Sequence, residues 1–166
     1  MSEPILKVRR GRQTDIPFIS SSWLKSFRNG AFVRGIPNDL YFRFHRRIVA
    51  ELLQRSLVAV LCEREDENQI VGWACAERSE EGALLVHYVY VKHDFRRAGF
   101  AKALIDMLIE SEDPVAIFYT HKTRAVMEYR ERYQAEGRVV DWPLKEWIYN
   151  PYLLFARLSH SWSVGV

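Results

Sequence analysis

Apolar and polar positions along this chain follow two different periods, and the change of period marks its predicted elements. A short apolar run at Ile5–Val8 predicts a strand, and two segments with apolar residues at helical spacing follow it, at about 16–27 and at 39–54. Between residues 57 and 78, two apolar runs flank the polar turn Asp66-Glu67-Asn68, which predicts an antiparallel hairpin. The first half of the chain therefore predicts one strand, two helices and a hairpin.

The second half of the chain predicts alternating strands and helices. The continuous apolar run 84–91 predicts a central strand, and apolar residues at helical spacing continue from Gly99 to about Glu110. Four further elements are predicted: a strand over 115–120, a helix over 123–135 closed by Gly137, a weak strand after it, and a final strand over 152–158. Pro143 and Pro151 bracket an aromatic-rich segment that predicts a loop.

The resulting order is β-α-α-β-β-β-α-β-α-β, without repeats or linkers, so residues 1–166 are predicted to form a single domain. This order predicts an α/β (α+β) fold, with a mixed, mostly antiparallel sheet flanked by helices. The strand–helix–strand unit at 84–119 predicts two strands that lie parallel or splay apart.

Charge is unevenly distributed along the chain. The net charge is +3, but residues 1–60 carry 11 Lys and Arg against 4 Asp and Glu, and the remainder is net negative. A basic first third can be a solvated face or can attract an acidic partner. Nucleic-acid binding is disfavoured, because the acidic remainder interrupts any continuous basic face.

Cysteine use and hydropathy indicate the compartment. Cys62 and Cys75 lie in apolar strand-like runs, which predicts buried free thiols in a reducing compartment. The sequence shows no signal-peptide core and no run of 18 apolar residues. These features predict a soluble cytoplasmic protein without a membrane partner.

The turn between the central strand and its helix carries the clearest candidate chemistry. Arg96, Gly99 and Ala101 follow an R-x-x-G-x-A spacing at the helix start. Gly99 permits a backbone conformation that a Cβ hinders, and the unpaired amides of a helix N-terminus attract an anion. Arg97 and Lys102 add positive charge. The segment predicts a phosphate cradle, although a plain helix start would give the same pattern.

The stretch VYVKHDFRRAGFAKALI resembles the central motif of the Gcn5-related N-acetyltransferase (GNAT) superfamily, in which an apolar strand ending in valine precedes [Q/R]-x-x-G-x-[G/A]. The predicted element order resembles that fold over roughly residues 5–158. The resemblance implies that acetyl-coenzyme A is the co-substrate. It implies that the cofactor contacts come from Val89, Tyr90, Val91, Arg96, Arg97, Ala98, Gly99, Phe100, Ala101 and Lys102.

The family often carries N-x-x-A-x-x-x-Y on the later helix, where the tyrosine can protonate the leaving thiolate. Ala125 and Tyr129 keep this spacing, and Lys122 stands in place of the asparagine. The resemblance thus makes Tyr129 the candidate general acid and Lys122 a cofactor contact. Tyr133, one turn further along, is an alternative acid, and either ring can instead be a core residue.

Amine acetylation also needs a base. His87 is the titratable group of the central strand whose ordinary pKa lies near neutrality, and it resembles a strand histidine that some family members use in a proton relay. Members with a strand glutamate carry it where Leu85 stands here. Glu77 and a water-mediated route are alternatives to His87, which can also be a satisfied core residue.

The resemblance implies an acyl-CoA-dependent N-acyltransferase acting on an amine of a small molecule or a protein. The alternative is an inactive GNAT-fold protein that binds a protein or nucleic acid through its basic first third. The five histidines show no zinc spacing, so no metal is expected. Family members often self-associate, which makes a homodimer an expectation. The candidate acceptor residues are Phe27, Phe32, Arg34, Tyr41, Phe42, Arg43, His45, Arg46, Arg47, Trp142, Trp147, Tyr149 and Tyr152.

Overall fold

The computed structural model describes residues 5–31, 33–135 and 147–151. Within them, six strands form one sheet in sequential order, and four helices cover it. The strands are β1 (Leu6–Arg10), β2 (Leu57–Glu63), β3 (Ile70–Arg78), β4 (Leu84–Val91), β5 (Ile117–Tyr119) and β6 (Trp147–Tyr149). The helices are α1 (Ile16–Arg28), α2 (Asn38–Arg55), α3 (Phe100–Glu112) and α4 (Arg124–Ala135). The predicted fold class and element order are confirmed.

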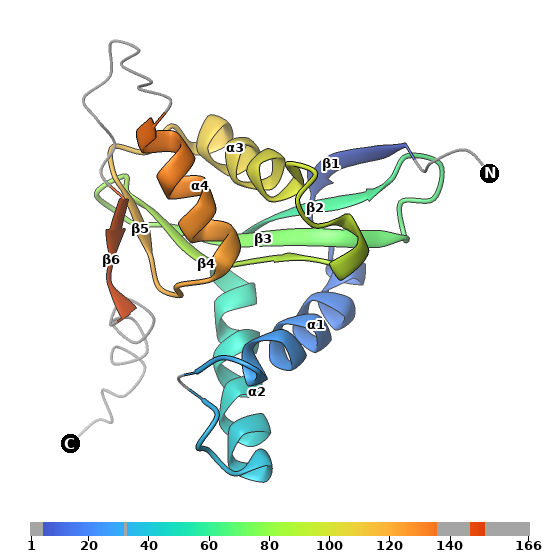
Figure 1. The fold of residues 1–166 in the computed structure, drawn as a ribbon, viewed down its shortest axis with the longest axis vertical. Coiled ribbons are helices and arrows are strands. Elements are labelled where there is room, and N and C mark those ends of the chain that lie inside the picture. Colours follow the sequence, from blue (N-terminus) through green and yellow to red (C-terminus); the bar gives the residue numbers. More distant parts are fainter. Residues whose placement is uncertain (1–4, 32, 136–146, 152–166) are drawn as a thin grey trace.

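The sheet is antiparallel from β1 to β4 and parallel from β4 to β6. Helices α1 and α2 lie against one face, and α3 and α4 lie against the other (Figure 1). The strand–helix–strand unit that the sequence predicts does place β4 and β5 parallel. Its strands pair because the connection through α3 is long enough to return the chain to the same end of the sheet.

The last strand differs from its prediction. The segment between Pro143 and Pro151 was expected to be a loop, but Trp147–Tyr149 pairs in parallel with β5. Trp147 packs its ring 5.1 Å from that of Tyr129, so tertiary contacts give this short aromatic segment a strand conformation. The predicted strands after Gly137 and over 152–158 lie outside the described residues.

A β-bulge at His87 divides β4 into two halves. Ala76 of β3 opposes Val86, but Cys75 opposes Tyr88, so His87 is an extra residue on β4. Because of this extra residue, the alternation of side chains changes phase. Leu84, Val86, Val89 and Val91 all enter the core under α3 and α4, whereas Tyr88 enters the core under α1 and α2.

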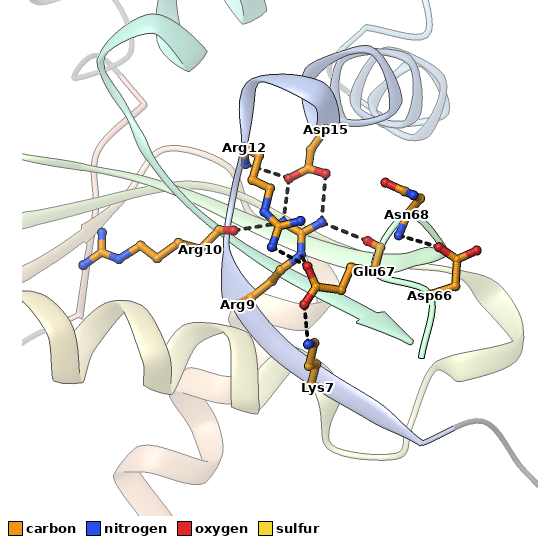
Figure 2. A network of polar contacts seen from close by, with 8 residues as sticks. All are labelled: Lys7, Arg9, Arg10, Arg12, Asp15, Asp66, Glu67 and Asn68. Carbon is orange, nitrogen blue, oxygen red and sulfur yellow. Dashed lines mark hydrogen bonds and ion pairs between the residues drawn. The ribbon is translucent and has the colours of Figure 1, made fainter. Parts of the chain in front are cut away.

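Basic residues of β1 and the segment after it pair with acidic ones (Figure 2). Arg9 donates two hydrogen bonds to Asp15, at 2.8 and 2.9 Å, and one to the Glu67 carbonyl. Lys7 and Arg12 form ion pairs with the Glu67 carboxylate. Part of the positive charge of the first third therefore joins β1 to the β2–β3 turn.

Cys62 and Cys75 are buried free thiols, as expected. None of the helices that the structure describes has the length and apolarity that a membrane span requires.

Candidate functional site

The two parallel central strands separate halfway along β4. Pairing between β4 and β5 covers Leu84–Val86 and ends at Tyr119, and the Thr120 amide makes a last hydrogen bond of 3.1 Å to the Val86 carbonyl. β4 continues to Val91 and pairs throughout with β3 on its other side. The second half of β4 therefore has one edge that β5 does not cover.

Hydrogen bonding at the end of β4 identifies the groups that face this open edge. The Lys92 amide donates to the Val71 carbonyl of β3 at 2.8 Å. Because backbone groups alternate along a strand, Val89 and Val91 direct theirs to the opposite side. The Val91 carbonyl accepts a hydrogen bond of 2.9 Å from Nε of Arg96. Val89 thus offers an edge amide and carbonyl that an extended ligand could pair with.

The turn after β4 leads into the N-terminus of α3. Gly99 has φ +82° and precedes the helix as its N-cap, without a side-chain cap. Arg97 also has positive φ, at +68°. The first helical hydrogen bond that returns to the cap runs from the Ala103 amide to the Gly99 carbonyl, at 3.1 Å. The amides of Phe100, Ala101 and Lys102 precede it, so they are available to an anion together with the positive end of the helix dipole.

A cavity of about 1070 Å³ connects the open edge of β4 with this helix N-terminus. All the predicted cofactor residues line this cavity except Ala98. Ala98 is exposed to solvent and is not part of the cavity wall. The wall at the α3 and α4 end carries six basic side chains and one acidic one: Arg96, Arg97, Lys102, Lys122, Arg124, Arg132 and Glu128. An anionic ligand with several phosphates suits this charge distribution.

Lys122, just before α4, and Tyr129 on α4 both line the cavity. The Lys122 ammonium lies 4.2 Å from the ring centroid of Tyr149 on β6, so the aromatic ring stabilises its charge. The Tyr129 hydroxyl donates a 2.7 Å hydrogen bond to Oδ1 of Asp106 on α3. Oδ2 of Asp106 accepts from Lys102 Nζ at 2.5 Å. Asp106 was not predicted from the sequence, because Tyr129, to which it is hydrogen-bonded, lies on a different helix.

His87 does not line the cavity. Its side chain is fully buried, with 0% exposure, at the bulge of β4. Its Nε2 lies 3.1 Å from Oε2 of Glu77, and its Nδ1 lies 3.1 Å from Oγ1 of Thr120. Glu77 also accepts a hydrogen bond of 3.2 Å from Nε of Arg55 at the end of α2. The structure therefore places the two candidate bases, His87 and Glu77, in one buried polar cluster.

Thr120 and His121 connect this cluster to the cavity. Both residues line the cavity, just beyond β5, and Thr120 Oγ1 lies 2.9 Å from Nδ1 of His121. Burial, and then the nearby His87, lower the pKa of His121 to about 3. Neither residue was predicted from the sequence. Their only signal was a polar pair at the end of a strand, and their proximity to His87 depends on how β4 and β5 pair.

The cavity end beneath α1 and α2 carries mostly apolar and aromatic side chains. Phe27, His45 and Tyr88 line it beside His121, and ring centroids lie 4.8 Å apart for Phe27 and His121 and 4.9 Å apart for Phe27 and His45. Burial lowers the pKa of His45. The described residues of this end contribute no carboxylate.

The predicted acceptor residues separate into groups. Phe27, His45 and Tyr149 line the cavity, but Tyr41 is in the core, where its hydroxyl donates to the Leu24 carbonyl. Phe42 and Arg46 line a separate hollow between α1 and α2. Four others lie outside both, with Trp147 buried and Arg34, Arg43 and Arg47 exposed. Phe32, Trp142 and Tyr152 lie outside the described residues.

The family model of the acetyltransferase (GNAT) domain matches residues 55–136, the segment from the end of α2 to just past α4. A ribosomal-protein-alanine N-acetyltransferase from Brucella melitensis biovar Abortus 2308 has a similar structure, with 20% identity and a TM-score of 0.52. The match covers 84% of this chain and 96% of that one. Residues 55–136 therefore belong to the GNAT acetyltransferase family, and the described residues have the GNAT fold.

Further GNAT structures share the fold. A GNAT family acetyltransferase from Brucella melitensis, solved in complex with acetyl-CoA, aligns at 17% identity and a TM-score of 0.57, over 76% of this chain and 82% of that one. A Corynebacterium glutamicum ATCC 13032 structure, described as histone acetyltransferase HPA2 and related acetyltransferase, aligns at 21% identity and a TM-score of 0.58, over the same shares. Comparison with curated protein sequences gives no significant match.

Metal-ligating side chains do not gather in this GNAT domain. Across residues 5–31, 33–135 and 147–151, no group of three His, Cys, Asp or Glu side chains could hold a metal ion.

Proposed function

We propose that this GNAT protein transfers the acetyl group of acetyl-coenzyme A to an amine of a small molecule or a protein. One observation carries the proposal: the uncovered edge of β4, the uncapped N-terminus of α3 and the side chain of Tyr129 all line one cavity. An extended amide-bearing arm, a phosphate group and a leaving thiolate need these three features, respectively.

The residues present fit two parts of acetyl-CoA, its pantetheine arm and its pyrophosphate. Val89, Tyr90 and Val91 would hold the pantetheine arm along β4, and the turn from Arg96 to Lys102 would hold the pyrophosphate. The unpaired amides of Phe100 and Ala101 and the basic side chains around them support this assignment. Lys122, on the same basic wall, would add a further cationic contact. When bound, acetyl-CoA supplies an activated acyl group, so the protein needs to supply only orientation and proton transfer.

Tyr129 is the proposed general acid. Tyr129 lines the cavity and keeps the A-x-x-x-Y spacing, and the hydrogen bond from its hydroxyl to Asp106 fixes its orientation. To protonate a thiolate, the hydroxyl would turn from Asp106 toward the cavity. His87 is the proposed proton acceptor, and because it does not line the cavity it would act through neighbouring groups.

The acceptor would occupy the end of the cavity beneath α1 and α2. Phe27, His45 and Tyr88 give this end aromatic walls, and carboxylates are absent from its described lining. An amine attached to an aromatic or apolar group suits such walls better than a polycation, whose charges would remain unpaired.

The alternative function, binding of a protein or nucleic acid through the basic first third, is less well supported. Lys7, Arg9 and Arg12 are engaged with Asp15 and Glu67, which lowers the net charge that this region offers to a partner. Homodimer formation and a cytoplasmic location stay predictions.

The test combines ligand binding with turnover. Acetyl-CoA at about 1,000 times its dissociation constant should stabilise the protein by about 4 kcal/mol, which thermal denaturation detects. Release of the free thiol of coenzyme A is then measured with a panel of acceptors: 2-phenylethylamine, putrescine and a short peptide with a free N-terminus. Binding together with amine-dependent thiol release supports the proposal. An unchanged melting temperature at millimolar acetyl-CoA would refute it.

A further inference from the structure

We propose that His121 is the residue that takes the proton from the acceptor amine, and that Thr120 passes a proton on to His87, which Glu77 holds. This inference rests on the proposed amine acetylation and names the base of that site. It is carried by a continuous row of polar atoms that begins at the cavity wall and ends in the buried cluster on β3 and β4.

Each step of this row is within hydrogen-bonding distance. His121 Nδ1 and Thr120 Oγ1 lie 2.9 Å apart, and the same hydroxyl lies 3.1 Å from His87 Nδ1. His87 Nε2 lies 3.1 Å from the Glu77 carboxylate. Exposure decreases along the row, from 8% at His121 to 0% at His87. His121 is thus the member of the histidine pair that an acceptor can contact, because His87 does not line the cavity.

The chemistry of the members sets the direction of every hydrogen bond. Oε2 of Glu77 accepts from Arg55 Nε, so it acts as a carboxylate acceptor and His87 must donate to it from Nε2. A neutral His87 then has an unprotonated Nδ1, to which the single hydroxyl proton of Thr120 is donated. Thr120 can only accept from His121, so His121 carries its proton on Nδ1 and is left with an unprotonated Nε2.

This arrangement allows a balanced transfer. The N–H bond of the ammonium breaks as an N–H bond forms at Nε2 of His121. The Nδ1 proton of His121 moves to the Thr120 oxygen, and the original hydroxyl proton of Thr120 moves to Nδ1 of His87. The products are a neutral amine, whose lone pair can attack the acetyl carbonyl, and a His87 imidazolium beside the Glu77 carboxylate. Reversal of the chain after turnover restores every proton.

The surroundings of His121 favour transfer over storage of the proton. The rings of Trp23, Phe27 and Tyr88 surround it, at centroid distances of 6.2, 4.8 and 5.5 Å, and the neighbouring titratable groups are His45, His87 and Tyr88. Its lowered pKa keeps the ring neutral near pH 7, because burial and the nearby His87 outweigh a hydrogen bond with the His87 backbone that raises the pKa. Beside His87, by contrast, the Glu77 carboxylate can stabilise a positive charge.

The tautomers provide a test that needs no acceptor. Long-range ¹H–¹⁵N spectra of the ¹⁵N-labelled protein at pH 7, with acetyl-CoA, are assigned through the His87→Gln and His121→Gln variants. The relay requires a neutral His87 protonated on Nε2 and a neutral His121 protonated on Nδ1. An imidazolium at position 121, or a His121 protonated on Nε2, would overturn the relay.

The hydroxyl of Thr120 provides the kinetic test. Thr120→Val keeps the shape of the side chain but interrupts the row, and should lower kcat by roughly 10²- to 10⁴-fold. Thr120→Ser restores the hydroxyl and should recover much of that loss. Ser111→Ala, which removes a hydroxyl that bonds the Leu108 carbonyl on α3 outside the cavity, is the matched control. Melting temperatures identify any variant whose loss reflects misfolding.

Glu77→Gln removes the carboxylate at the far end while keeping its size, and should also lower kcat without weakening acetyl-CoA binding. Full turnover by folded Thr120→Val would overturn the relay but leave the proposed acetylation intact. A wild-type protein that does not bind acetyl-CoA would instead refute the acetylation itself, so the two failures are distinguishable.

Discussion

Tyr129 on α4 and Asp106 on α3 are joined by a 2.7 Å hydrogen bond in which the tyrosine hydroxyl is the donor. The same carboxylate forms an ion pair with Lys102, one turn earlier on α3. The proposed general acid is therefore oriented by the helix whose N-terminus would form the proposed phosphate cradle. This contact ties the position of the acid to the position of the cradle.

Tyr129→Phe should lower kcat by roughly 10²- to 10⁴-fold, because it removes the proton that the leaving thiolate would receive. The dissociation constant for acetyl-CoA should stay the same, since the ring remains in place. Loss of the hydrogen bond to Asp106 should reduce the free energy of unfolding by only about 1 kcal/mol. Steady-state kinetics, calorimetry and urea denaturation measure these three quantities.

Tyr133→Phe is the matched control, since this tyrosine also lies on α4 and is the alternative acid from the sequence. It should leave kcat close to that of the wild type. A loss of turnover in Tyr133→Phe, with normal turnover in Tyr129→Phe, would reverse the assignment.

Gly99→Ala should weaken both folding and acetyl-CoA binding. Gly99 has φ +82°, a conformation that costs a residue with a Cβ about 1–2 kcal/mol. A new methyl group would meet no protein atom within 4 Å, so the stability loss comes from the backbone alone. Gly35→Ala is the control, because its Cβ also meets nothing and its φ is ordinary. Equal effects of the two substitutions in denaturation and binding would contradict the prediction.

The contact between Asp15 and Arg9 should make the free energy of unfolding depend on pH in the acidic range. Burial alone would raise the pKa of Asp15, but hydrogen bonds from Arg9 and the Arg12 amide outweigh it, and the pKa is lowered. A lowered folded pKa contributes stability above about pH 4, the unfolded value, and this contribution is lost as pH falls through the folded pKa.

Asp15→Asn should therefore cost about 1.5–3 kcal/mol at pH 7, the worth of hydrogen bonds to charged groups, and much less below pH 3. Urea denaturation between pH 2 and pH 7 checks this. Glu80→Gln, an exposed carboxylate in the β3–β4 turn, serves as the control and should change little. A constant difference between wild type and Asp15→Asn across this range would contradict the interpretation.

His121 should make the fold less stable in mild acid. Its folded pKa of about 3 lies below the ordinary value of 6.5, so below pH 6.5 the unfolded state binds a proton that the folded state does not. The free energy of unfolding should fall by up to about 1.4 kcal/mol per pH unit from this residue between those two values. His121→Gln should reduce that slope in urea denaturation, while the exposed His93→Gln should not.

Local patterns determined much of this fold and the cofactor half of the site. The apolar run Leu84–Val91, the glycine turn and the apolar stripe of α3 are adjacent in sequence and predict both their own structure and the phosphate cradle. Tyr129 was predicted from the resemblance to the family motif, in which Ala125 and Tyr129 keep the A-x-x-x-Y spacing. The elements themselves followed from short-range periods.

The strand at Trp147–Tyr149 escaped prediction for the opposite reason. It has no alternation of its own, and its conformation depends on pairing with β5 and on the packing of Trp147 against Tyr129. Asp106 was not predicted for the same reason. This residue of α3 accepts a hydrogen bond from Tyr129 of α4, and the contact depends on how the two helices pack.

The sequence by itself thus determined the order of the elements and the glycine turn at Gly99 on which the proposed cradle rests, since each depends on residues within one or two turns or strands. Only the tertiary structure decided how the proposed base meets the cavity. The bulge at His87 buries that ring beside Glu77, and the end of β5 brings Thr120 and His121 next to it. These contacts join residues that lie 10 and 33 positions apart, and pairing of strands rather than local periodicity creates them.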